Sequence, residues 1–264
     1  MTKRLALLLL VLLSITACAK QDDAAIAAAD TSTSTSTSTA DTTAAAEPAA
    51  AAAPAEPDVA AAADAIAASA MTAALAAPPL VAGTDYVEIP NGQPYQPLNG
   101  KIEVVEVFAY WCGHCASFQP LVDAWKRKLP ADVRFTYVPL AGGPTDALAR
   151  AYFASEASGQ LDKTHNAIFS AIHLNRTLTQ RPTAEEIAAL VGKQGVDAKG
   201  FADAMNGFAI GGQLNRAQQF AQRSGVEGTP TLIVNGKYRI LGKTLEDHLR
   251  IANQLIVQQR PATP

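Results

Sequence analysis

The chain has 264 residues, of which 17% are charged and 48% hydrophobic, and its formal net charge is −3. A weakly acidic chain lacks the strong positive charge of most nucleic-acid-binding proteins, so we expect no nucleic-acid partner. The aromatic residues all lie after residue 80. The part of the chain that contains them, roughly 185 residues long, is enough for one domain with a hydrophobic core.

The chain begins like an exported protein. Two basic residues precede the apolar run LALLLLVLL (5–13), as in a secretory signal peptide. The segment ITAC (15–18) resembles the bacterial lipobox, whose cysteine is acylated and becomes the first mature residue. We therefore expect residues 1–17 to be removed and Cys18 to carry a membrane-anchoring lipid. The alternative is an ordinary A-x-A cleavage site, which would discard Cys18. Either route leads to an oxidising compartment, where disulfides persist.

Residues 18–80 are rich in Ala, Thr, Ser and Pro. TSTSTSTST (31–39) is of low complexity and cannot bury a core, so we expect a disordered linker. AAADAIAASAMTAALAA (61–77) has the composition of a helix, because alanine is the best helix former. Its large apolar residues are sparse, which favours an inert tether over a helix docked on the domain. The folded domain is thus expected at residues 81–264.

The domain opens with alternating strand and helix signals. DYVEI and KIEVVEVFAY (101–110) predict strands, and the second is apolar enough to be buried on both faces. SFQPLVDAWKRKL repeats its apolar residues every three or four positions and predicts an amphipathic helix that contains Pro120. VRFTYVPL (133–140) predicts the next strand. Strand, helix and strand form a parallel βαβ unit.

A helical block interrupts this pattern. Residues 144–224 are alanine-rich with helical periodicity, and Thr183 and Glu186 form a capping-box pattern in front of one helix. TLIV, the Asn-Gly pair at 235–236 and KYRI then predict a β-hairpin, and TLEDHLRIANQLIVQQ predicts a closing helix. The fold class is therefore α/β with a helical insertion domain.

Two cysteines, Cys112 and Cys115, form the segment CGHC where the buried strand ends and a helix begins. Structural zinc needs four ligands, and neither a second CxxC nor histidines at ligand spacing accompany this pair, so we expect no metal. A disulfide across so short a loop is a poor structural staple. A redox pair explains more. The helix N-terminus and His114 lower the pKa of the Cys112 thiol, and Cys115, one turn further in, is the resolving thiol. No metal or organic cofactor is implied.

VEVFAYWCGHC followed by a helix, together with GVEGTPTLIVNGKY more than 100 residues later, resembles the thioredoxin superfamily. The helical insert between them resembles the DsbA family of bacterial periplasmic thiol oxidases. The resemblance covers roughly residues 83–260. It implies a thioredoxin fold, a redox-active Cys112–Cys115 disulfide, and reduced or unfolded exported polypeptides as substrates in the periplasm. It also implies reoxidation by a quinone-linked membrane partner like DsbB.

The resemblance assigns roles residue by residue. Cys112 is the nucleophile and Cys115 its partner. Pro230 corresponds to a cis proline that faces the cysteines, and Thr229 before it exposes its backbone to an extended peptide. Glu106, six residues before Cys112, corresponds to a buried acid that relays the proton of Cys115. A trans proline that opens a strand and an exposed strand glutamate are the alternatives.

Gly113 departs from the family, whose members often carry proline there. Together with His114 it gives the dipeptide of eukaryotic disulfide isomerases, and this dipeptide tunes the reduction potential. We expect an exported dithiol oxidase. An isomerase or reductase of the same fold and a non-catalytic peptide-binding chaperone are the alternatives. Isomerases like DsbC carry a dimerisation domain where this chain has its linker, so we expect a monomer.

Overall fold

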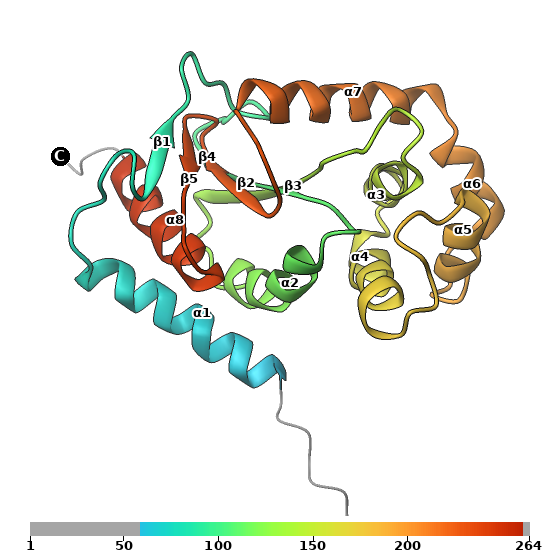
Figure 1. Cartoon of the computed structure of the whole chain (residues 1–264), viewed down its shortest axis with the longest axis horizontal. Helices are drawn as coiled ribbons and strands as arrows, with labels where there is room; N and C mark the ends of the chain where they lie inside the picture. Colours follow the sequence, from blue (N-terminus) through green and yellow to red (C-terminus); the bar gives the residue numbers. More distant parts are fainter. Residues whose placement is uncertain (1–58, 261–264) are drawn as a thin grey trace, which may run out of the picture. The chain divides into compact units, whose positions relative to one another are not determined.

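The computed structural model describes residues 59–260 (Figure 1). The predicted signal peptide, Cys18 and the Thr/Ser-rich segment lie outside this range. The strands form one sheet in the order β1-β5-β4-β2-β3. They are β1 (Tyr86–Glu88), β2 (Ile102–Phe108), β3 (Val133–Pro139), β4 (Thr231–Val234) and β5 (Tyr238–Ile240).

The helices flank the sheet or form the insert. They are α1 (Val59–Ala76), α2 (Gly113–Lys126), α3 (Ala147–Ala157), α4 (Leu161–Phe169), the π-helical η1 (Ser170–Leu174), α5 (Ala184–Gly192), α6 (Ala198–Met205), α7 (Phe208–Arg223) and α8 (Leu245–Gln259). In Figure 1, α2 and α8 lie on one side of the sheet, α7 runs along the other, and α3 to α6 cluster beyond β3.

The parallel βαβ unit and the hairpin predicted from the sequence are both present in the sheet. β2 and β3 are parallel and are connected by α2, whereas β4 pairs antiparallel with both β2 and β5. The predicted hairpin turn at 235–236 is confirmed, with Asn235 and Gly236 both at positive φ. The structure is therefore an α/β thioredoxin fold interrupted by a helical insertion.

The helical insert agrees with the prediction in position and differs in detail. Its helices run from Ala147 to Arg223, and the capping box of Thr183 and Glu186 is present at the start of α5. α7 begins at Phe208, one to two turns earlier than the segment NRAQQFAQRSG indicates. The helix predicted from DKTHNAIFSAIHL is α4 followed by the π-helical turn η1.

Residues 61–77 have helical composition, and residues 59–76 do form a helix, α1, but the prediction that this segment is an inert tether was wrong. This helix packs against α2 and α8 through alanines at three- and four-residue spacing, namely Ala63, Ala67, Ala70 and Ala74. The Asp64 carboxylate accepts a hydrogen bond from Arg127 at 2.9 Å, and its backbone carbonyl accepts one from Lys128 at 2.7 Å. Among the described residues, α1 is the one helix long and apolar enough to cross a membrane. Its contacts are nevertheless those of a helix docked on a domain.

All seven residues of β2 are buried, including two glutamates. Side chains alternate along a strand, so Glu103 and Glu106 point to opposite faces of the sheet. The Glu103 carboxylate accepts hydrogen bonds from the backbone N–H groups of Tyr95 and Gln96 and from Arg134. Glu103 is thus fully paired, and it belongs to the structural core on the face away from the cysteines.

An aromatic cluster fixes the carboxyl end of β2, just before the cysteines. The Phe108 ring lies 5.1–5.9 Å, between centroids, from five other rings, which belong to Tyr110, Tyr137, Tyr152, His165 and Phe169. Edge-to-face contacts of this kind favour defined ring positions. Since Tyr152, His165 and Phe169 come from the insert, the insert and the sheet hold the start of the CGHC segment together.

Candidate active site

Cys112 occupies the N-cap position of α2. Its backbone is extended, with φ −82° and ψ 117°, and its Sγ accepts a hydrogen bond from the Cys115 backbone N–H at 3.2 Å. The first N–H groups of a helix have no partner within the helix and carry partial positive charge. A sulfur in this position is therefore stabilised as a thiolate. Both cysteines are reduced in the structure.

A loop from the far end of the chain meets Cys112. The Thr229–Pro230 peptide bond is cis, as the sequence predicted. The Cys112 thiol donates a hydrogen bond to the Thr229 carbonyl at 3.2 Å. β4 begins directly after Pro230 and pairs with β2, with Thr231 opposite Val107. The sheet thus places this loop beside the reactive sulfur, although 117 residues separate Thr229 from Cys112.

The two thiols have opposite electrostatic environments. Hydrogen bonds from the Cys115 thiol, from the Thr229 side chain and from the N–H groups of Cys115 and His114 lower the pKa of Cys112 to about 5. Cys115 has no exposed surface, and its burial, its hydrogen bond to Cys112 and the charge of Glu106 raise its pKa far above the ordinary range. At neutral pH the reduced pair therefore carries one negative charge, on Cys112.

Glu106 lies on the same side of the sheet as the cysteines. It is 1% exposed, so the alternative of an exposed strand residue is wrong. Its Oε2 has no hydrogen-bond partner among residues 59–260. Burial raises the pKa of Glu106 to about 8, although Lys126 opposes the shift. Glu106 is accordingly protonated at pH 7. Its role as a proton relay stays a prediction.

Gly113 and His114 form the first turn of α2 and are exposed. A Cβ atom added at Gly113 would meet no other atom within 4 Å, so packing does not require glycine there. Gly113 is at the first helical position, where proline is well tolerated. Within this dipeptide, the backbone N–H of His114 is the group that hydrogen-bonds to Cys112.

His165, which sequence reasoning did not assign to the site, is buried beside the active-site helix. His165 is 4% exposed. Its Nδ1 is 2.8 Å from the Tyr110 hydroxyl, its Nε2 is 3.1 Å from Gln119 Oε1, and burial lowers its pKa to about 3. His165 shares the buried face of α4 with Ile168 and Phe169, at three- and four-residue spacing, and that periodicity was the available signal. His165 ties the insert to the active-site helix.

Comparisons with known proteins agree with this geometry. A profile of the DSBA-like thioredoxin domain matches residues 103–252. The thiol:disulfide interchange protein DsbA of Pseudomonas aeruginosa is 41% identical over 194 residues, which cover 72% of this chain and 90% of that protein. DsbA of Pseudomonas syringae is 38% identical over 195 residues, covering 72% of this chain and 89% of the relative.

Solved structures show the same likeness. The crystal structure of oxidoreductase DsbA from Xylella fastidiosa superposes with a TM-score of 0.66 at 41% identity, covering 68% of this chain and 97% of that chain. The crystal structure of Pseudomonas aeruginosa DsbA superposes with a TM-score of 0.63 at 39% identity, covering 68% of this chain and 94% of that chain.

Proposed function

The chain belongs to the DSBA-like thioredoxin domain family and is a dithiol oxidase that introduces disulfide bonds, and we propose that it acts on exported polypeptides in the periplasm through Cys112 and Cys115. The observation that carries this proposal is the asymmetry of the two thiols. A sulfur whose pKa is lowered to about 5 leaves readily as a thiolate, and a disulfide that contains such a sulfur is a strong oxidant.

The reaction has two exchange steps. A substrate thiolate attacks Cys112 Sγ in the oxidised protein, the Cys112–Cys115 bond breaks, and a mixed disulfide forms while Cys115 takes up a proton. The second substrate thiolate then attacks the substrate sulfur of the mixed disulfide, and Cys112 leaves as a thiolate. The substrate loses two electrons and two protons. One proton stays on Cys115 and the other reaches solvent.

Glu106 supports the first step in this proposal. Cys115 is a poor leaving group because its buried thiolate is strongly disfavoured. Glu106 is protonated at pH 7 and interacts electrostatically with Cys115, so it is suited to hand a proton to the departing sulfur. When the pair is reoxidised, the same carboxylate takes the proton back.

Thr229 and Pro230 form the substrate-facing edge in this proposal. The Thr229 carbonyl already lies at hydrogen-bond distance from Cys112, so a peptide joined to Cys112 passes alongside this backbone. An extended peptide gains affinity from main-chain hydrogen bonds without demanding a particular side chain. Such an edge suits an enzyme that accepts many unfolded polypeptides.

The remaining parts of the proposal concern the cell. We propose that the protein acts as a monomer, that a lipid on Cys18 anchors it to a membrane facing the periplasm, and that a quinone-linked DsbB-like partner reoxidises it. The lipobox-like ITAC segment supports the anchor. The intact mass of the exported protein tests it, since a mature chain that starts after residue 19 without lipid would contradict acylation of Cys18.

Oxidation of a reduced, unfolded protein by the oxidised domain tests the central proposal. Each turnover should consume one Cys112–Cys115 disulfide. Cys112→Ala and Cys115→Ala should each abolish turnover, because neither variant can form the Cys112–Cys115 disulfide that oxidises the substrate. Equilibration of the Cys112/Cys115 pair with a glutathione redox buffer separates an oxidase from a reductase. The pair of a strong oxidase has a high reduction potential and is therefore mostly in its dithiol form in that buffer. A potential near that of thioredoxin would overturn the oxidase proposal.

A further inference from the structure

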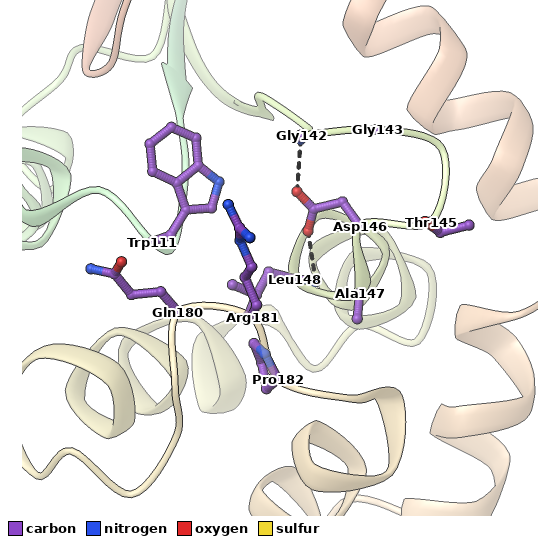
Figure 2. Close-up of a pocket in the computed structure, with 10 residues that line it drawn as sticks. All are labelled: Trp111, Gly142, Gly143, Thr145, Asp146, Ala147, Leu148, Gln180, Arg181 and Pro182. Atoms are coloured by element: carbon purple, nitrogen blue, oxygen red, sulfur yellow. Dashed lines mark hydrogen bonds between the residues drawn. The ribbon is translucent and has the colours of Figure 1, made fainter. Parts of the chain in front are cut away.

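A cavity of about 640 Å³ opens between Trp111 and two segments that are distant from it in the sequence (Figure 2). One wall is Trp111, which directly precedes Cys112. A second is formed by residues of the 142–148 segment, at the start of α3. The third is formed by residues 180–182, which lead into α5. We call this cavity the Trp111–Arg181 pocket.

The one carboxylate in the lining of the pocket is already compensated. Asp146 caps α3, and its carboxylate accepts hydrogen bonds from the N–H groups of Gly142, Leu148 and Ala149 at 2.8, 3.0 and 3.1 Å. A cap carboxylate is neutralised largely by these donors and by the positive end of the helix dipole. Asp146 therefore shapes the wall and is not available to pair with a cation in the pocket.

The one cation in the lining is uncompensated. The guanidinium of Arg181 makes no hydrogen bond or ion pair with any of residues 59–260, and Figure 2 shows it reaching into the space between Trp111 and the Gly142–Asp146 wall. Its backbone is held by a hydrogen bond from its N–H to Thr179 Oγ1 and by Pro182, which follows it. Trp111 is 37% exposed. The pocket thus offers a free fork of N–H donors beside an open aromatic ring.

We propose that the Trp111–Arg181 pocket is a second substrate subsite, which takes an acidic side chain close in sequence to the cysteine that attacks Cys112. This inference rests on the proposed function. The substrate sulfur must bond to Cys112, and an extended peptide advances about 3.3 Å per residue, so its neighbouring side chains lie within reach of Trp111. A carboxylate pairs with a guanidinium fork in bidentate geometry, and the aliphatic stem of Glu packs on the indole ring.

The subsite adds side-chain preference to backbone binding at Thr229. Unfolded polypeptides present many cysteines, and backbone pairing does not distinguish among them. A free positive charge in the pocket that Trp111 lines would favour cysteines that are followed or preceded by Asp or Glu. It would select which cysteine of a substrate reacts first and would leave the exchange chemistry unchanged.

Dithiol peptides test the subsite directly. A series carries Glu, Gln or Lys at each position up to four residues on either side of the first cysteine, and the rate of oxidation by the oxidised full-length protein is measured under conditions where kcat/KM determines it. We expect one or two positions at which the Glu peptide reacts about 3- to 5-fold faster than the Gln peptide at low salt, the size of a partly exposed ion pair. The preference should shrink as ionic strength rises towards about 0.15 M.

The ratio of the Glu and Gln rates is then compared between the wild type and three variants, which cancels the effect of the charge on the peptide thiol itself. Arg181→Gln should lower the Glu-to-Gln rate ratio to the ratio measured at peptide positions that do not reach the pocket. Arg181→Lys should retain much of the preference for Glu, and Arg181→Glu should oxidise the Lys peptide fastest. Arg176→Gln is the matched control. Arg176 lies in the same segment between η1 and α5 and is exposed, but it does not line the pocket.

The outcomes separate the two proposals. If the wild type oxidises none of the peptides, the proposed function fails. If it oxidises all of them with the same Glu-to-Gln ratio as Arg181→Gln, the function stands and the subsite is refuted. An equal loss of preference in Arg176→Gln would also refute it, since the effect would then arise from overall charge.

Discussion

Replacement of Glu106 by Gln should stabilise the protein, and the gain should grow with pH. Glu106 is buried, and Oε2 has no partner among the described residues, so the ionised form is held in a poor environment. Its pKa is raised from 4.5 to about 8. In the unfolded chain the carboxyl ionises near its ordinary pKa. Folding therefore takes up a proton between pH 4.5 and 8, and stability is lost as pH rises through that window.

The magnitude follows from the two pKa values. A difference of one in pKa corresponds to about 1.36 kcal/mol, so ionisation of Glu106 opposes folding by about 1 kcal/mol at pH 5, about 3 kcal/mol at pH 7 and about 5 kcal/mol at pH 9. Glu106→Gln removes this penalty but keeps the shape of the side chain. The free energy of unfolding of the reduced variant should therefore exceed that of the reduced wild type by an amount that increases over this range.

Urea unfolding of the reduced proteins at pH 5, 7 and 9 measures this difference. Glu103→Gln is the matched control, since Glu103 is buried on the same strand but is paired with Arg134 and two backbone N–H groups. That change should destabilise the protein by about 1–3 kcal/mol, because it weakens a satisfied buried network. If the stability difference between Glu106→Gln and wild type does not change with pH, Glu106 ionises normally and its proposed relay role loses its basis.

Three further results are expected. The alkylation rate of Cys112 by iodoacetamide should rise with a midpoint near pH 5, and a midpoint above about pH 8 would contradict its low pKa. At pH 7 the free energy of unfolding of the reduced protein should exceed that of the oxidised protein by at most about 3 kcal/mol, and by less after solvent screening. This difference should shrink as pH falls from 9 through 5, and equal stability of the two forms at pH 7 would contradict a stabilised Cys112 thiolate. A chain that begins at residue 80 should unfold at lower urea than one that begins at residue 58, because it lacks α1; identical midpoints would show that α1 contributes nothing to stability.

Strong local signals in the sequence predicted much of the fold. β2 and β3 are apolar runs flanked by turns, the capping box at Thr183 satisfies its own helix start, and the Asn235-Gly236 pair supplies the two positive φ angles of a tight hairpin. Each of these features depends on residues within a few positions of one another. Neighbouring residues therefore determine them before any tertiary contact forms.

α1 could not be predicted in the same way. Its buried stripe consists of alanines, and alanines also occupy much of its exposed surface, so no apolar face stands out from the pattern. Which face is buried depends on the shapes of α2 and α8. Two contacts reinforce the docking, between Asp64 and Arg127 and between Gln254 and the Pro78 carbonyl. The partners are separated by 63 positions in the first pair and by 176 positions in the second. Patterns in a single sequence carry no information about contacts over such separations.

The candidate site was predictable where one motif carries it. CGHC identified Cys112 and Cys115, and the TP pair at 229–230 identified the cis proline. The sequence also showed that Glu103 and Glu106 face opposite sides of a strand. It also predicted a strand buried on both faces, and β2 is buried along its whole length. It did not identify what covers the face of Glu103, which is the segment that contains Tyr95. The Trp111–Arg181 pocket was not foreseen, since its three walls meet only in the folded chain.

The geometry of α2 shows what glycine instead of proline at position 113 changes for the hydrogen bonds to the Cys112 thiolate. The N–H groups that stabilise the Cys112 thiolate belong to His114 and Cys115, and the N–H of Gly113 is not among them. Proline at position 113 would remove an N–H that the sulfur does not use, at a helical position suited to proline and in open space. The thiolate donors are thus independent of whether glycine or proline stands there. The lowered pKa of Cys112 thus follows from its place at the start of α2.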